Sequence, residues 1–196
     1  ITSSIYMNFW KPDIIHKTYF NNHIYKTINA KKILNIWDLN HEIYPELYNK
    51  KKGWRPKKIS LATADHVICS SYKTRDDLEK YYNFNLKKTS VVYQGVNQFI
   101  DYKKITYNKK KYLLYVGSRL KYKNFENLLN ALSINKKILK DFQLVCFGEE
   151  KITPFELNLI DKLKLNKKNI FFVSGNDQKL QNYYLNSAAL IYPSKN

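Results

Sequence analysis

Short β-rich runs alternate with helical patterns along almost the whole chain, and this alternation limits the possible folds more than any other feature. Strands are expected at residues 12–16, 31–39, 65–70, 89–93, 112–116, 142–147, 169–173 and 188–193. Helical patterns fall between most of them, at residues 55–64, 72–82, 125–132 and 178–186, and a further helix is expected to begin at residue 154. Strands and helices alternating at this spacing predict an α/β protein with parallel sheets flanked by helices.

The alternation is interrupted once, and this divides the chain into two expected domains. A polar, lysine-rich stretch without apolar periodicity follows Gly95, and we interpret residues 95–111 as a linker. The first domain then covers residues 1–94 and the second covers residues 112–196. Each repeats the strand and helix pattern, so two parallel sheets covered by helices are expected.

Several helix starts are marked by capping residues. Ser71 or Thr74 is expected to cap the helix at 72–82, and Asp177 the helix at 178–186. The sequence "TPFE" predicts a capping box, in which Thr153 accepts from the Glu156 amide and the Glu156 carboxylate reaches back.

The helical patterns also predict which faces are buried. Apolar side chains repeat at helical spacing from Phe125 to Leu132, which predicts one buried face, and Leu180, Tyr183 and Tyr184 form another.

Composition narrows the protein class. The 196 residues are 44% hydrophobic, which indicates a globular protein with one or two cores. The formal charge of +18 suggests nucleic acid or an anionic membrane as a partner, but the lysines are scattered, so no nucleic acid partner is expected.

Cys69 and Cys146 lie in strand-like runs and are expected to be buried thiols. No apolar run of membrane-spanning length or secretory leader is recognised, so a cytoplasmic protein is expected.

The most informative stretch is "YLLYVGSRLKYKNFENLL", where a strand leads through a short loop into a helix. Ligands of such sheets bind at the carboxyl ends of the strands. Gly117 permits a close backbone approach, and free amides at the helix start attract an anion. Arg119 and Lys123 would repel that positive helix end unless an anion lay between them, and a diphosphate suits a guanidinium fork and an ammonium. The alternative is that both are solvated cations.

This stretch, "LVCFGEE", "IFFVSGNDQKLQNYYLNSAALIYPS" and the upstream "ADHVICSSYKTRDDLEKYY" together resemble the GT-B-fold glycosyltransferases of family 4, including mannosyltransferase-like members. The resemblance implies two Rossmann-like domains, an acceptor-side domain at 1–94 and a nucleotide-sugar domain at 112–196, both incomplete. It implies the transfer of a hexose, with retention of configuration, from a GDP- or UDP-sugar to a glycan or lipid-linked acceptor. The hexose that it suggests is mannose. No cofactor and no metal are expected.

The resemblance also implies roles for individual residues. Arg119 and Lys123 match the basic pair that grips the donor pyrophosphate, and are expected to be catalytic. The residues that match the backbone and nucleoside contacts of the donor site are Gly117, Ser118, Gly148, Glu149, Ser174 and Gly175. Trp37 stands where the family has a histidine, so His41 is the substitute catalytic candidate, or else a partly buried histidine without that role.

Fixed cations and amides can stabilise a departing diphosphate in place of a metal ion, which makes the resemblance chemically reasonable. The family continues with an E-x7-E element and begins with a longer acceptor domain, so these 196 residues alone are expected to be inactive. A basic module that binds nucleic acid or a membrane surface is the alternative function, and an inactive gene remnant is a third. Peripheral contact with the inner face of an anionic membrane fits either of the first two.

Overall fold

The computed structural model describes residues 9–23, 29–48, 50–95, 111–119, 121–148 and 151–195, with side chains for all of these except 50–54 and 121. The chain divides into two compact units, Ile1–Asn97 and Gln98–Asn196. Most of the stretch interpreted as a linker, residues 96–110, lies outside the described residues.

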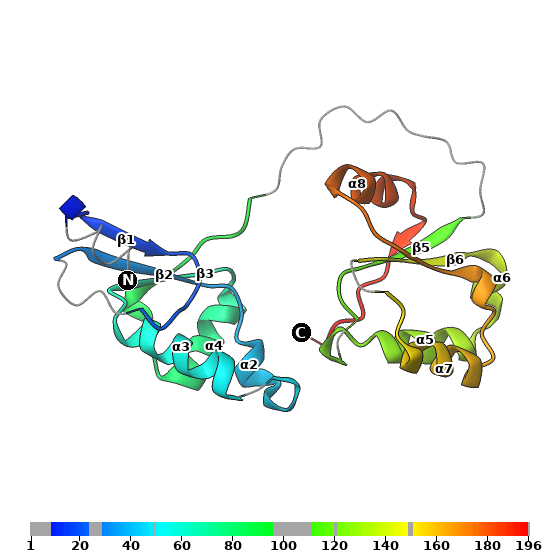
Figure 1. Ribbon diagram of the computed structural model, residues 1–196, viewed down its shortest axis with the longest axis horizontal. Helices are drawn as coiled ribbons and strands as arrows, with labels where there is room; N and C mark the ends of the chain where they lie inside the picture. The colour runs from blue at the N-terminus through cyan, green and yellow to red at the C-terminus, as the bar shows by residue number, and fades with distance from the viewer. Residues whose placement is uncertain are drawn as a thin grey trace. The chain divides into compact units, whose positions relative to one another are not determined.

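The first unit contains a parallel sheet with the strand order β1-β2-β3-β4 (Figure 1). Its strands are β1 (Ile14–Lys17), β2 (Lys31–Ile36), β3 (His66–Cys69) and β4 (Thr89–Val91). Its helices are α2 (Asn40–Ile43), α3 (Lys50–Ala62) and α4 (Tyr72–Tyr82), with single 3-10 turns η1 (Pro45–Leu47) and η2 (Leu86–Lys88).

One face of this sheet carries the core of the first unit. Leu34 and Val67 project from β2 and β3 onto Leu61 of α3 and Leu78 of α4, and all four are buried. The other face carries polar pairs in which the His16 ring bonds Asn35 at 2.8 Å and the His66 ring bonds Ser90. Figure 1 shows α2, α3 and α4 on one side of this sheet.

The second unit repeats the design with the strand order β7-β6-β5-β8, again parallel. Its strands are β5 (Tyr112–Val116), β6 (Gln143–Phe147), β7 (Ile170–Val173) and β8 (Ala189–Leu190). Its helices are α5 (Phe125–Ile134), α6 (Lys137–Asp141), α7 (Pro154–Lys162) and α8 (Asp177–Asn186), with 3-10 turns η3 (Lys121–Lys123) and η4 (Lys167–Asn169).

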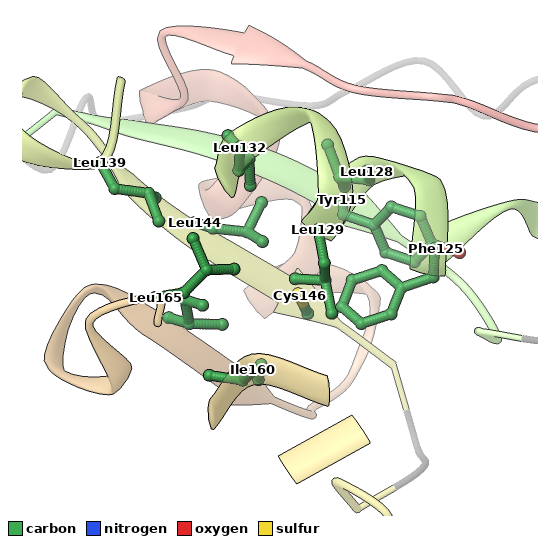
Figure 2. Close-up of a cluster of buried hydrophobic side chains, with 11 residues drawn as sticks. Tyr115, Phe125, Leu128, Leu129, Leu132, Leu139, Leu144, Cys146, Ile160 and Leu165 are labelled. Carbon is green, nitrogen blue, oxygen red and sulfur yellow. The ribbon is translucent and has the colours of Figure 1, made fainter. Parts of the chain in front are cut away.

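Both faces of this second sheet are covered. Tyr115 and Cys146 point to one face, where they pack with Leu129 of α5 and Ile160 of α7 (Figure 2). Leu114, Val145 and Phe147 point to the other face, where Leu180 and Tyr183 of α8 pack against them. Burial on both faces explains why these strands are almost continuously apolar.

Most local predictions are confirmed. Ser71 caps α4 by accepting from the Thr74 amide at 3.1 Å, and the capping box of Thr153 and Glu156 is complete at the start of α7. The predicted apolar face of α5 is buried, and both cysteines are buried free thiols.

Other predictions are wrong in detail. Asn176, not Asp177, caps α8, because its side chain accepts from the Lys179 amide while Asp177 is already the first helical residue. Tyr184 does not join the face formed by Leu180 and Tyr183 and is 38% exposed.

Several element bounds also differ from those predicted. Strand β2 ends at Ile36 rather than at residue 39, and β8 contains only Ala189–Leu190. Helix α3 begins at Lys50, before the predicted start at 55, and continues through Pro56.

Candidate functional site

Three of the predicted donor-site residues come directly after three neighbouring strands of the second sheet. Val116, Phe147 and Val173 end β5, β6 and β7 and stand in one register row. The next residues are Gly117, Gly148 and Ser174, and the backbone ladder continues through them: Gly117 N–H donates to Phe147 O, and Gly148 N–H to Val173 O, both at 2.9 Å. The structure therefore brings these residues together at the carboxyl edge of the sheet.

Glycine is favoured at one of these positions by its backbone conformation and at another by lack of space. Gly117 has a φ of +106°, which side-chain-bearing residues rarely adopt. A Cβ atom on Gly148 would lie 3.0 Å from the Gly117 carbonyl oxygen. The two loops thus pass in backbone contact, and the strand edge at Gly117 and Gly148 carries no side chain.

The loop after β7 is covered by a lysine. Lys179 Nζ donates to the Ser174 carbonyl at 2.7 Å, and a Cβ atom on Gly175 would lie 2.4 Å from Lys179 Cδ. Gly175 is therefore needed for the stem of Lys179 to lie across the loop. The side chain of this lysine, from the first turn of α8, is a feature that the sequence reading missed.

The start of α5 forms the wall of a depression. Asn124 precedes the helix with a φ of 61°, and its side chain accepts no bond from the first-turn amides in the described structure. It accepts instead from Asn127 Nδ2 at 2.7 Å. The depression has a volume of about 300 Å³ and is lined by Arg119, Asn124, Phe125, Glu126, Asn127 and Lys195. Uncapped amides and the helix dipole make this end of α5 favourable for an anion.

Arg119 lines the same depression but is held by a carboxylate. Its Nε donates to Glu156 Oε1 at 2.6 Å, and its Nη2 donates to Glu156 Oε2 at 3.3 Å and to the Lys151 carbonyl at 2.8 Å. The guanidinium carbon also lies 5.0 Å from the centre of the Phe172 ring, and the side chain is 3% exposed. In this structure the fork of Arg119 therefore binds Glu156, where the sequence reading placed a diphosphate.

Glu156 has two tasks, since its Oε2 also accepts from Thr153 N–H in the capping box of α7. Burial acts to raise the pKa of Glu156, but hydrogen bonds from Arg119 and Thr153 and the charge of Arg119 outweigh it, so this pKa is lowered from 4.5. The carboxylate is thus charged at neutral pH and fixes the guanidinium.

Lys123 is held from a different direction. It ends η3, two residues before α5, and its Nζ donates to the Tyr192 hydroxyl at 2.7 Å. The same atom lies 4.8 Å from the centre of the Tyr192 ring and 5.3 Å from that of Tyr122. Arg119 and Lys123 therefore have separate partners, Glu156 of α7 for one and Tyr192 after β8 for the other.

The segment after β8 is fastened to this loop. Lys195 N–H donates to the Tyr122 carbonyl at 3.0 Å, and Asn124 Nδ2 donates to the Pro193 carbonyl at 3.0 Å. These bonds bring Lys195 to the depression. The sequence reading took residues 188–193 as strand alone, and no local pattern marks Tyr192 or Lys195 as neighbours of a loop about 70 residues earlier.

Arg119 is the one predicted residue among those that line the depression in the described structure, and Ser118, Glu149 and His41 remain to be placed. Ser118 accepts from the Tyr115 hydroxyl through its carbonyl at 2.8 Å, next to the turn at Gly117. Glu149 lies outside the described residues. His41 belongs to the first unit, so it is described separately.

His41 lies in α2, just beyond the carboxyl end of β2. Its ring packs on Tyr48 at a centroid distance of 4.3 Å, and its buried Nδ1 has no hydrogen-bond partner among the described residues. Trp37, which the resemblance places at a histidine position, donates from its indole to the Thr18 carbonyl at 2.8 Å. The side chain of neighbouring Glu42 is 4% exposed and bonds Lys57 and Tyr82.

Comparison with known protein families decides the class. Residues 96–196, just over half of the chain, match the family described as "Glycosyl transferases group 1". The chain belongs to this family. Residues 5–98 match a second description, "Glycosyltransferase Family 4", so the two matches together span nearly the whole of this glycosyltransferase chain. The family predicted from the sequence motifs is confirmed.

Individual relatives agree with this assignment. The chain is 29% identical over 167 residues to the O-antigen chain mannosyltransferase RfbU of Salmonella typhimurium, covering 82% of this chain and 45% of that protein. It is similar in structure to WaaG, a glycosyltransferase involved in lipopolysaccharide biosynthesis, with a TM-score of 0.70 and 15% identity over 98% of this chain and 56% of WaaG. The chain is also similar in structure to the galactosyltransferase WaaB, with a TM-score of 0.66 and 16% identity. This match covers 98% of this chain and 53% of WaaB.

These structural similarities to two glycosyltransferases support the predicted fold class, and the parallel sheets with flanking helices found in this chain agree with it. The chain spans about half the length of the relatives it matches. Within the described residues, no helix is both long and apolar enough to cross a membrane.

Proposed function

We propose that this chain is part of a retaining, metal-independent glycosyltransferase that moves a hexose from a nucleotide-diphosphate sugar to a glycan or lipid-linked acceptor. The reaction transfers the hexosyl group from a diphosphate oxygen to an acceptor hydroxyl oxygen, and releases the nucleoside diphosphate and the hydroxyl proton. Mannose from GDP-mannose is the proposed donor sugar, since the curated relative is a mannosyltransferase. The proposed location is the cytoplasm, with the acceptor reached at the inner face of a membrane.

The observation that carries this proposal is the depression at the start of α5. It combines uncapped first-turn amides with Lys195, beside a strand edge at Gly117 and Gly148 that lacks side chains. A diphosphate placed there would accept from the amides and face the positive end of the helix dipole. The ammonium of Lys123, two residues before the helix and bonded to Tyr192, adds a second positive charge near this helix end.

These groups suit the chemistry of the proposed reaction. Negative charge collects on the departing diphosphate as the bond from sugar to phosphate breaks. Fixed donors aimed at that charge lower the barrier, and removing one such donor typically costs ~3 kcal/mol. Arg119 would contribute in its Glu156-bound position through its charge, or directly after exchanging Glu156 for phosphate oxygens.

In the first unit, we propose acceptor binding at the carboxyl edge of the sheet. His41 stays the catalytic candidate there, because its Nδ1 is buried without a partner among the described residues. Glu42 beside it is fixed by Lys57 and Tyr82, and this holds α2 in place.

The proposal is tested by nucleotide binding to the whole chain. GDP or UDP at ~100 times its dissociation constant should raise the free energy of unfolding by ~2.7 kcal/mol. Lys123→Ala should lose most of this gain, while Lys162→Ala, in the last turn of α7, should keep it. The matched control changes net charge equally, and Lys162 is not among the residues that line the depression.

The alternative, a basic binding module, predicts the opposite pattern. Neither nucleotide would then stabilise the chain, an RNA oligomer or anionic vesicle would bind with a steep salt dependence, and Lys123→Ala would weaken binding no more than Lys162→Ala. The charge of +18 is the observation that favours this alternative.

A further inference from the structure

Tyr192 contacts Lys123 but was not among the residues expected in the donor site. It comes after β8 at the carboxyl edge of the sheet, and its side chain is exposed although its ring lies 4.8 Å from the Lys123 ammonium. The backbone on either side is fixed, since Ile191 N–H donates to Leu114 O at 2.7 Å and Asn124 Nδ2 donates to Pro193 O. Tyr192 is thus an exposed phenol on an anchored segment.

The donor and acceptor roles in the contact with Lys123 are decided by chemistry. A lysine ammonium has three N–H donors and no acceptor, so the phenol oxygen must accept in the 2.7 Å bond. The hydroxyl proton of Tyr192 then points to some other acceptor. The bond from Lys123 lowers the pKa of Tyr192, burial opposes this, and the Lys123 charge and a hydrogen bond with the Ser194 side chain lower it further, so the O–H of Tyr192 is a stronger donor than a free phenol.

Two donors therefore stand side by side before the first turn of α5. The remaining N–H groups of Lys123 and the O–H of Tyr192 are close enough to serve oxygens of one phosphoryl group, because their heavy atoms are 2.7 Å apart. Ser194 belongs to the same anchored segment, and its hydroxyl lies 3.5 Å from the Tyr122 carbonyl.

We propose that Tyr192 is a further phosphate-binding residue, which holds the Lys123 ammonium in place and donates its own hydroxyl proton to the diphosphate of the sugar nucleotide. This inference rests on the proposed function. It adds a hydrogen-bond donor from the segment after β8 to the donors from the loop after β5. The ligand would then be contacted from both segments at the start of α5.

Tyr192→Phe is the decisive variant, because it keeps the ring over Lys123 and removes only the hydroxyl. Tyr122→Phe is the matched control, since the Tyr122 ring lies at a comparable 5.3 Å from the same ammonium. The affinity of the whole chain for GDP, UDP and inorganic pyrophosphate is measured by calorimetry, together with the unfolding midpoint of each ligand-free variant.

We expect Tyr192→Phe to weaken the binding of GDP and of pyrophosphate by a similar factor of about ten or more, since a hydrogen bond to a charged group is lost. Tyr122→Phe should stay within about twofold of the unchanged chain, and neither variant should shift the ligand-free midpoint by more than ~2 °C. A similar loss for pyrophosphate locates the contact on the phosphates rather than on the base.

Two results overturn the inference in distinguishable ways. If the unchanged chain binds GDP or UDP and Tyr192→Phe binds it equally well, Tyr192 only packs its segment and the proposed function is untouched. If the unchanged chain binds neither nucleotide nor pyrophosphate, the proposed function fails and the role of Tyr192 falls with it.

Discussion

The two units contain the same arrangement of parallel strands and helices, yet their carboxyl edges are built differently. In the first unit the edge is filled: Trp37 comes directly after β2, its indole bonds Thr18, and its carbonyl accepts from Ser70. In the second unit Gly117 and Gly148 occupy the corresponding positions after β5 and β6. One edge is closed by side chains and the other is left as bare backbone beside the start of α5.

Each unit also contains a buried ion pair, and the difference between the pairs matches the difference between the edges. Lys57 and Glu42 are 0% and 4% exposed, and Lys57 bonds the Asp38 carbonyl as well. Arg119 and Glu156 are nearly as buried, but Arg119 borders the depression. The first pair is sealed in the fold, while the second lies where a ligand or water can replace a lost partner. The residues at the carboxyl end of each strand thus decide whether that edge is closed by side chains or left as bare backbone.

The largest expected effect is on the sealed pair. Glu42→Gln leaves the Lys57 charge buried without a carboxylate, which should cost ~3–5 kcal/mol. All three tryptophans precede residue 98, so tryptophan fluorescence during urea unfolding reports the first unit. Asp161→Asn, in a second-unit pair whose side chains are 52% and 57% exposed, is the control; its urea unfolding is followed by circular dichroism, and it should cost at most ~1 kcal/mol. An equal loss of unfolding free energy in Glu42→Gln and Asp161→Asn would contradict the claim that burial makes the first pair important for stability.

A smaller loss is expected for the pair that borders the depression. Glu156→Gln should cost ~1–3 kcal/mol, because Arg119 loses a charged acceptor but can turn toward water. A lowered pKa means that the Glu156 contribution is complete above 4.5 and disappears as the pH falls through the folded-state value. Stability of the second unit, measured between pH 6 and 2.5 by circular dichroism, should therefore lose part of its acid dependence in Glu156→Gln. A cost equal to that of Glu42→Gln would break the contrast between the pairs.

The two edges should also differ in their tolerance of added methyl groups. Gly148→Ala places a Cβ atom against the Gly117 carbonyl and should cost ~1–3 kcal/mol. Gly95, in the first unit after β4, has no atom of the described residues within 4 Å of the added atom, so Gly95→Ala should be neutral or stabilise by ~0.4–1 kcal/mol. Thermal unfolding of both variants measures this, and a tolerated Gly148→Ala would show that the loops after β5 and β6 are not in close contact.

The smallest expected effect concerns the caps. Asn176→Ala should cost ~1 kcal/mol, the same as Ser71→Ala in the first unit, because each removes a side-chain acceptor for a first-turn amide. Asp177→Ala should cost only ~0.3 kcal/mol, since Asp177 contributes charge near the helix dipole and not the cap. The reverse order in urea unfolding would restore the cap that the sequence predicted.

The fold was predictable because its signals are local. The apolar repeat from Phe125 to Leu132, the pairing of Thr153 with Glu156 and the buried strand around Cys146 each depend on residues a few positions apart. Asn176 and Asp177 are both good caps and adjacent in sequence, so only the backbone decides between them.

The site was less predictable because its contacts join distant segments. Arg119 bonds Glu156, which lies 37 residues later in the sequence, and Lys123 bonds Tyr192, which lies 69 residues later. The sequence indicated the loop and the helix start as the place for an anion, which stays a prediction. It could not show that Glu156 serves both a helix cap and the guanidinium, since both tasks use the same carboxylate.

The central claim is that the second unit, and not the first, binds the diphosphate of a sugar nucleotide. Each unit holds one buried cysteine, Cys69 or Cys146, and burial raises the pKa of Cys146 to about 12, so each thiol reacts only when its unit opens. Pulsed thiol labelling in dilute urea, read peptide by peptide, is the most direct measurement. GDP or UDP at ~100 times its dissociation constant should slow labelling of Cys146 about a hundredfold and leave Cys69 unchanged. Unchanged labelling of Cys146, or equal slowing of both thiols, would contradict the claim.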